Sequence, residues 1–156
     1  MTTTDPEQLW MDFLDGVSLL QCIDLSIVDN TSPEAACLFM NLYHCLLLHA
    51  YMVVGLPNSL FKWSHFFRFC SYEAFGDIFS LAELEHCIMR SGESCMTRPN
   101  INFLAQHFLI PHLQYSFAMQ VRDYRLLWGI FCGATSNVSE IPIYTPELLD
   151  MQLNAI

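Results

Sequence analysis

The amino-acid sequence predicts an α+β fold in one compact domain, with a central buried helix packed on a small mixed or antiparallel sheet. Two observations support this class: four segments carry the capping signals of helix starts, and aromatic-rich runs between them have the composition of strands. These segments do not alternate strictly, which favours α+β over a parallel α/β fold. A chain of 156 residues can bury about 70% of the surface that it exposes when unfolded.

Three helix starts place Pro at the first helical position, where its missing N–H costs no hydrogen bond. They are Asp5-Pro6-Glu7, Ser32-Pro33-Glu34 and Thr145-Pro146-Glu147. The fourth, Ser80-Leu81-Ala82-Glu83, is a capping box, in which each polar side chain pairs with a backbone donor of the first turn. The sequence therefore predicts helices over residues 6–27, 33–54, 81–91, about 99–110, and from 146 to the end.

Three runs predict strands. The aromatic-rich run 66–72 is followed by Gly76-Asp77, a turn signal that predicts a hairpin back into Ile78-Phe79. The nearly continuous apolar run 124–131 suits a strand that is covered on both faces. The short run 141–144 contains Pro142, which favours an edge strand.

Charge and composition restrict the partners. The chain has 16 acidic and 6 basic residues, a net charge of −10, and no cluster of Lys and Arg of the kind that binds phosphate backbones or anionic lipids. We therefore expect no nucleic-acid partner, and we expect a protein or peptide as the partner class, a basic one remaining open. The sequence does not determine the oligomeric state.

The cysteines point to a reducing compartment. Their number is seven, which is odd, and the chain opens on Met-Thr-Thr-Thr-Asp-Pro-Glu, without the basic and apolar regions of a signal peptide. Mostly buried thiols in a cytoplasmic protein are the expected state. No Cys-x-x-Cys pair occurs, so we expect neither a zinc ribbon nor a redox pair, and no cofactor.

Residues 35–56 form an uncharged, largely apolar stretch that is long enough to span a bilayer. Asn41, His44 and His49 lie inside it, and no basic residue flanks its start. A buried core helix explains the same composition at lower cost, so we expect no membrane span.

Three blocks carry a family resemblance. The first is Leu38-Phe39-Met40-Asn41-Leu42-Tyr43-His44 with His49-Ala50-Tyr51 and Gly55-Leu56-Pro57-Asn58-Ser59, and the second is Phe79-Ser80-Leu81 with Leu84-Glu85-His86-Cys87-Ile88-Met89-Arg90. The third is Asp123-Tyr124-Arg125, then Cys132-Gly133-Ala134-Thr135-Ser136 and Ile143-Tyr144-Thr145-Pro146-Glu147. In this order, over about residues 32–154, they resemble the family of the domain of unknown function number 547.

The resemblance implies a module of a larger protein, with a fold comparable to thiol hydrolases of the papain and transglutaminase kind; it implies no settled activity. The chain departs from the family pattern at several positions. His44 stands where a second Asn is usual, Asn137-Val138 where Cys-Pro is usual, and Pro142 where Arg is usual. The last helix stops at Ile156, which suggests a chain cut short.

One polar stripe on the predicted central helix could carry chemistry. Its members fall within an arc of about 140° at helical spacing: Cys37, Asn41, His44, Cys45 and His49. Such groups must be hydrogen-bonded when buried, and either they tie neighbouring backbone into the core or they line a pocket. Cys45 and His49 have the i,i+4 spacing of metal ligands, but no third ligand is signalled, so we expect no metal site.

The candidate nucleophile is Cys132, at the end of the run 124–131 and before a tight loop, 133–136, whose backbone N–H groups and Ser136 could contact an oxyanion. A thiolate needs a nearby cation or imidazole, so His86 or His49 would be the base and Asn41 the orienting group. Neighbours on a helix point about 100° apart, so a direct pair between Glu85 and His86 is not expected.

Further binding candidates are Glu85, beside His86, and the pair Asp123 and Arg125. That pair is expected either as an ion-paired brace or as an anion-binding Arg. Two hypotheses for the whole domain follow. It is a thiol hydrolase or transferase that uses Cys132, or a protein-binding module with a degenerate site. The substitutions at 137, 138 and 142, beside the candidate nucleophile, favour the binding module.

Overall fold

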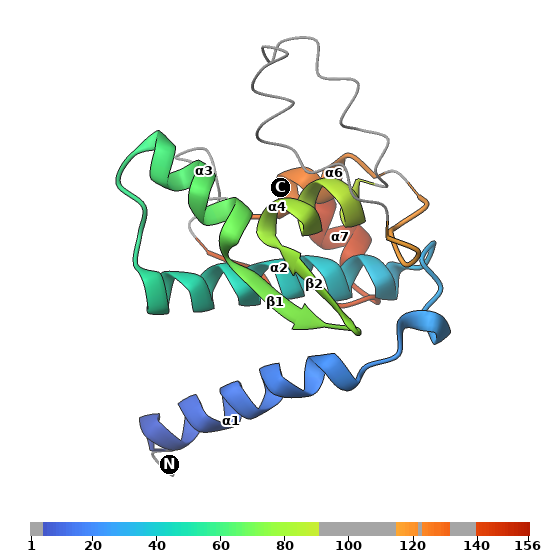
Figure 1. Ribbon diagram of the computed structural model, residues 1–156. Coiled ribbons are helices and arrows are strands. Elements are labelled where there is room, and N and C mark those ends of the chain that lie inside the picture. The colour runs from blue at the N-terminus through green and yellow to red at the C-terminus, as the bar shows by residue number, and fades with distance from the viewer. Residues whose placement is uncertain (1–4, 91–114, 122, 132–139) are drawn as a thin grey trace.

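The computed structural model describes residues 5–90, 115–121, 123–131 and 140–156, and it confirms the α+β class. Helix α2 (Pro33–Val54) runs through the middle of the molecule, with a small hairpin and helix α3 (Leu60–Phe69) against it. Figure 1 shows helix α1 (Pro6–Leu19) on one side of α2 and helices α6 (Arg125–Gly129) and α7 (Leu149–Asn154) on the other.

Helix α2 confirms the predicted bounds. The Ser32 side chain accepts a hydrogen bond from the Ala35 N–H at its start, and the helix ends before Gly55, whose φ of 84° is left-handed. Its buried residues form the centre of the core: Ala35, Ala36, Cys37, Phe39, Met40, Leu42, Tyr43, His44, Leu46, Leu47 and Ala50. By length and composition alone α2 could cross a membrane, and 50% of its most apolar window is buried inside the fold, as in the core helix of a globular protein.

The predicted hairpin is present and shorter than expected. Strands β1 (Ser71–Ala74) and β2 (Asp77–Ser80) pair antiparallel, with Tyr72 opposite Phe79 and Ala74 opposite Asp77. The two-residue turn has positive φ at both positions, 59° at Phe75 and 76° at Gly76, as tight hairpins require. Among the described residues these two strands are the whole sheet.

The prediction of a strand over 66–72 is wrong for its first four residues, which belong to α3. Ser59 caps this helix by accepting from the Lys62 N–H at 3.3 Å. Trp63 and Phe66 then pack on Tyr51 of α2, with ring centroids 6.2 Å and 5.2 Å from the Tyr51 ring. An i,i+3 aromatic pair on one partner is a helical pattern, and this packing outweighs the β-propensity of the aromatic residues.

The predicted helix over 81–91 is present as two short pieces. The capping box at Ser80 and Glu83 begins α4 (Leu81–Glu83), which continues into η3 (Leu84–Met89), a π-helical turn. Leu81, Leu84 and Ile88 are fully buried, and the Ile88 carbonyl accepts from the Met119 N–H at 3.0 Å. The predicted helix over 99–110 lies outside the described residues.

The prediction of a strand over 124–131 is wrong. Residues Arg125–Gly129 form the one-turn helix α6 instead, and the Asp123 side chain just before it accepts a hydrogen bond from the Arg125 N–H at 2.9 Å. Residues 141–144, predicted as an edge strand, run without strand pairing. They bring Tyr144 into the core, where its hydroxyl donates to the Gly129 carbonyl at 2.7 Å. The C-terminal helix begins at Leu149, three residues later than predicted.

The first helix is shorter than predicted and lies at the surface. It ends at Leu19, and 3₁₀ turns at Leu20–Cys22 and Leu25–Ile27 replace the rest of the predicted 6–27 helix. None of the residues of α1, all of which the structure describes, is buried. Its end is tied to the hairpin tip, because the Phe75 N–H donates to the Leu20 carbonyl at 3.0 Å.

Candidate functional site

Asn41 lies on the side of α2 that faces the C-terminal segment. Its amide nitrogen donates to the Tyr144 carbonyl at 2.8 Å, and its amide oxygen accepts from the Tyr144 N–H at 2.9 Å. Both ends of the side chain therefore hold one backbone unit. In the structure this residue, predicted as the orienting group of a catalytic site, braces the C-terminal segment against α2.

His44 has a comparable role one turn along α2. Its Nε2 accepts from the Phe131 N–H at 2.9 Å, so the ring proton of the neutral form is on Nδ1. The side chain is buried, and this desolvation lowers the pKa of His44 to about 4 against a smaller opposite effect of the Pro142 carbonyl. His44 is thus a neutral core group that holds the residue before Cys132.

His49 and Cys45 turn toward the hairpin. His49 Nδ1 lies 2.8 Å from the hydroxyl of Tyr72 on β1, and the Cys45 sulfur lies 3.8 Å from the same hydroxyl. Trp10 and Phe13 of α1 pack edge-on against the His49 ring, with centroids 5.5 Å and 5.2 Å away. Burial lowers the pKa of His49 and raises the pKa of Cys45, so both groups favour their neutral forms.

Glu85 and His86 lie on the π-helical turn. Contrary to the sequence expectation they approach each other, with His86 Nδ1 3.8 Å from a Glu85 carboxylate oxygen. The stronger partner of Glu85 is Arg90, whose guanidinium donates to the same oxygen at 2.5 Å. The wider π turn accounts for the contact between Glu85 and Arg90, since it places residues five apart near one another.

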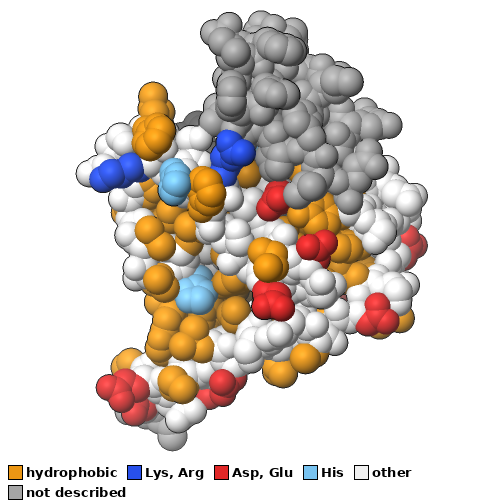
Figure 2. All heavy atoms as spheres, viewed as in Figure 1, with side chains coloured by type: hydrophobic (Ala, Val, Ile, Leu, Met, Phe, Trp, Pro, Cys, Tyr) orange, Lys and Arg blue, Asp and Glu red, His pale blue; other side chains and the backbone are white. Residues whose placement is uncertain are grey.

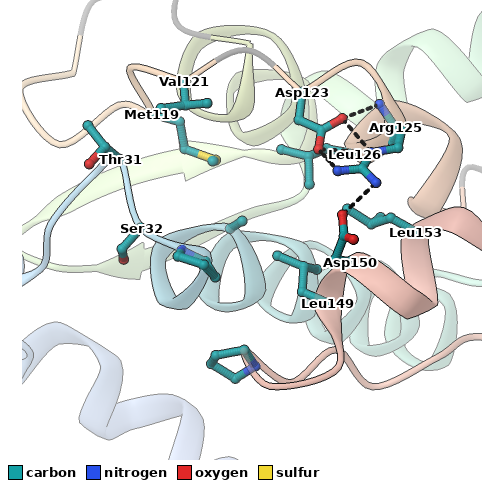
Figure 3. Close-up of a pocket in the computed structure, with 13 residues that line it drawn as sticks. Thr31, Ser32, Met119, Val121, Asp123, Arg125, Leu126, Leu149, Asp150 and Leu153 are labelled. Carbon is teal, nitrogen blue, oxygen red and sulfur yellow. Dashed lines mark hydrogen bonds and ion pairs between the residues drawn. The ribbon is translucent and has the colours of Figure 1, made fainter.

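Asp123 and Arg125 form the predicted ion pair, although on a helix start and not on a strand. The guanidinium of Arg125 donates to Asp123 at 2.7 Å, to Asp150 at 2.7 Å and to the Asn154 side chain at 2.6 Å. Figure 3 shows Arg125 between the two carboxylates, beside a cavity of about 210 Å³. Hydrogen bonds from Arg125 hold the pKa of Asp123 below its ordinary value. The cluster binds α6 to α7, which is the brace that the sequence offered as one alternative.

Cys132 and Ser136 lie outside the described residues. Among the other predicted site residues, the structure brings Asp123 to Arg125 and Glu85 to His86. It gives His49 and Asn41 different partners, Tyr72 and Tyr144. Within the described part of the chain, no group of three His, Cys, Asp or Glu side chains could hold a metal ion.

A surface groove lies where the end of α2 meets α3, and we name it the α2–α3 groove. Its volume is about 510 Å³. It is lined by Val54, Gly55, Leu56, Pro57, Phe61, Lys62, His65, Phe66, Phe69 and Cys70. On α3 the lining residues Phe61, Lys62, His65, Phe66 and Phe69 follow helical spacing, so one face of this helix forms one wall.

The sequence reasoning missed this groove for an identifiable reason. The predicted strand over 66–72 begins inside α3. With α3 split in this way, the sequence does not show that residues 61, 62, 65, 66 and 69 share one face of a helix. The signal that could have revealed it is the Ser59 N-cap followed by apolar residues at 63, 66 and 67, which form the inner side of a helix. The remaining apolar residues, Phe61 and Phe69, then have no place in the core.

Comparison with known proteins yields one match. A family model described as "Protein of unknown function, DUF547" matches residues 28–156. This range contains α2, the hairpin, the α2–α3 groove and the C-terminal helices, and it excludes α1. No curated protein and no solved structure matches the chain.

Proposed function

The chain belongs to the DUF547 family of proteins of unknown function, and on that premise we propose that it is a protein-binding module that holds a peptide segment of its partner in the α2–α3 groove. The family name assigns no activity, so the proposal is based on the surface of this molecule. It agrees with the partner class that the sequence favoured.

The observation that carries the proposal is the exposure of large apolar side chains around the groove. Leu60 is 90% exposed, Phe61 82% and Leu56 72%. Val53, Val54 and Phe69 are exposed next to them. Contiguous apolar patches on a soluble protein mark surfaces that another molecule covers, because covering them removes apolar area from water.

The shape of the groove favours a peptide over a small metabolite. A small-molecule site encloses most of its ligand, whereas the Phe61 and Phe69 side chains on this wall project into solvent. Projecting aromatic side chains that flank a shallow apolar surface are typical of the central contacts of protein interfaces. The groove also continues from α2 onto α3, so an extended or helical segment can contact both elements.

A displayed peptide library tests the proposal. The wild-type chain should enrich a defined set of peptides, and the Phe61→Asp variant should not, because a carboxylate in the groove disrupts the apolar contact. Ile78→Asp is the matched control, since Ile78 is 63% exposed on β2 and does not line the groove. Enrichment that Phe61→Asp leaves intact, or that Ile78→Asp abolishes equally, would contradict the proposal.

A thiol hydrolase or transferase of the papain or transglutaminase kind, with Cys132 as nucleophile and His86 or His49 as base, is the second candidate. The described residues give it little support. His49 is hydrogen-bonded to Tyr72, and His86 lies beside the Glu85 carboxylate. The reactivity of Cys132, treated in the Discussion, decides between the two functions.

A further inference from the structure

The α2–α3 groove differs from the rest of this acidic chain in charge. Residues 35–72 contain none of the 16 acidic residues and two of the 6 basic ones, Lys62 and Arg68. Both basic residues are exposed on α3. In Figure 2 the blue side chains lie at the α3 end of the molecule, next to orange and pale-blue ones, while the red groups are spread over the other elements.

Two arginines outside the groove pair with carboxylates of the fold. Arg90 donates to Glu85, and Arg125 lies between Asp123 and Asp150. Lys62 and His65 line the groove, and Arg68 is exposed on the same helix. At ideal helical spacing, Arg68 lies about 20° around the helix from Phe61, next to the groove wall.

We propose that the partner segment is acidic: apolar side chains of the partner occupy the α2–α3 groove, and its Asp or Glu residues pair with Lys62 and Arg68. This inference rests on the proposed function, because it assigns the chemistry of the ligand of the same groove. It also reverses the expectation from net charge, which left a basic partner open. The net charge of −10 describes the whole chain, whereas a ligand meets the local charge of the surface that it covers.

Charge complementarity of this kind acts on recognition in two ways. Opposite charges at the rim of an apolar contact speed association, and like charges exclude wrong partners. An acidic segment gains both effects at α3, while a basic segment meets Lys62 at the groove. Because these charges are exposed, salt screens them, and affinity should fall as ionic strength rises.

The test uses the peptide most enriched by the wild-type chain, labelled with a fluorophore and titrated with the full chain. We expect Asp or Glu beside its apolar residues. Changing these to Asn or Gln should weaken binding about fivefold to tenfold, as expected for the loss of several exposed ion pairs. Raising the salt to about 0.5 M should weaken the acidic peptide and leave the amide version nearly unchanged.

Two variants with equal change in net charge locate the effect. Lys62→Gln should weaken the acidic peptide about threefold, whereas Gln120→Glu, at an exposed position outside the groove, should change affinity less than twofold. Equal effects of the two variants would overturn the inference, because a general field would then explain the charge dependence.

Other outcomes separate this inference from the proposed function. Enriched peptides that bind through Phe61 but carry no acidic bias overturn the inference and leave the binding module standing. A library that yields no peptide overturns both. Vesicles with about 30% phosphatidylserine that bind the wild-type chain, but not Lys62→Gln, would replace the peptide by a membrane surface. Dimerisation that only Phe61→Asp abolishes would make the occupant a second copy of the chain.

Discussion

The side chain of Asn41 holds the backbone of Tyr144 from both sides, donating to its carbonyl at 2.8 Å and accepting from its N–H at 2.9 Å. The two residues are 103 positions apart in the chain, so this contact joins the central helix to the C-terminal segment. Tyr144 is itself buried, and its hydroxyl donates to the Gly129 carbonyl. One amide therefore binds residues 140–156 to α2 through both backbone groups of Tyr144.

Asn41→Ala should lower the free energy of unfolding by about 1–3 kcal/mol, because it leaves both backbone groups of Tyr144 without their partner. Chemical denaturation followed by circular dichroism measures the change. Asn58→Ala is the control, since Asn58 is exposed, and it should change stability by less than about 0.5 kcal/mol. An Asn41→Ala variant as stable as the parent would contradict the brace.

His44 should make the fold sensitive to acid. Its pKa is lowered from 6.5 to about 4 by burial, so between these values the unfolded chain binds the proton that the folded chain excludes. The contribution to stability is complete above pH 6.5 and decreases as pH falls toward 4. Between pH 7.5 and pH 5 the loss should be about 2 kcal/mol.

The pH dependence of unfolding for His44→Gln isolates this effect. Gln cannot titrate, so the stability of the variant should fall less than that of the parent over the same pH interval, whatever its stability at pH 7.5. Parallel pH profiles for the two proteins would show that His44 is protonated in the fold.

Tyr72→Phe should lower stability by about 1 kcal/mol, because His49 Nδ1 loses the hydroxyl that lies 2.8 Å away. Tyr124→Phe removes a hydroxyl from a residue that is 75% exposed, and its effect should be within about 0.5 kcal/mol. The histidine NMR signals give a second readout, since only Tyr72→Phe should move the resonances of His49. If both variants behave alike, the hydroxyl does not bind His49.

Gly129→Ala should destabilise the fold by about 1–3 kcal/mol. A Cβ at this position would lie 2.6 Å from Met40 Cε and 2.8 Å from Tyr144 Oη; the methionine can move, but the rigid tyrosine ring cannot do so without breaking its bond to the Gly129 carbonyl. Gly16→Ala is the matched control, because nothing lies within 4 Å of its Cβ, and in the middle of α1 it should stabilise by about 0.5–1 kcal/mol. Thermal unfolding of the two variants should therefore shift in opposite directions.

Limited alkylation with iodoacetamide at pH 6, read by mass spectrometry, tests the second candidate function. We expect no preferential labelling of Cys132 and no slowing in His86→Ala or His49→Ala. Burial raises the pKa of Cys37 to about 11 and also raises the pKa of Cys45, so these two should label last, whereas Cys22 is exposed. Labelling of Cys132 first, in a manner that needs either histidine, would favour the hydrolase over the binding module.

Local sequence signals, such as caps and turn residues, were sufficient to predict helix α2 and the position of the hairpin turn. Helix α2 has a Ser-Pro-Glu start and Gly55 at its end, and both bounds were predicted. The hairpin turn needed positive φ at two residues, and Gly76 signalled its position. The family was also predicted, since blocks from three separate segments agree with it.

The errors lie where tertiary contacts override local preference. The run 124–131 is apolar enough for a buried strand, but the Asp123 side chain binds the Arg125 N–H, and no neighbouring strand among the described residues offers a ladder. The aromatic run 66–72 was likewise predicted as a strand from its β-propensity. In the structure Phe66, together with Trp63 before it, packs on Tyr51 of α2, and both residues belong to helix α3. Tyr72 was missed as the partner of His49 because no local pattern links residues 23 positions apart.

The π-helical turn at Leu84–Met89 makes this region sensitive to length as well as to composition. Residues five apart are separated by about 140° around an α-helix but by only about 50° around a π-helix, which is why Glu85 can reach Arg90. An α-helix over the same residues would rotate Arg90 away from the carboxylate, whereas deleting one residue between the two would leave them four apart, about 40° around an α-helix and again in reach of each other. In related sequences, a one-residue gap at this point would therefore be compatible with an ordinary α-helix that carries the same ion pair.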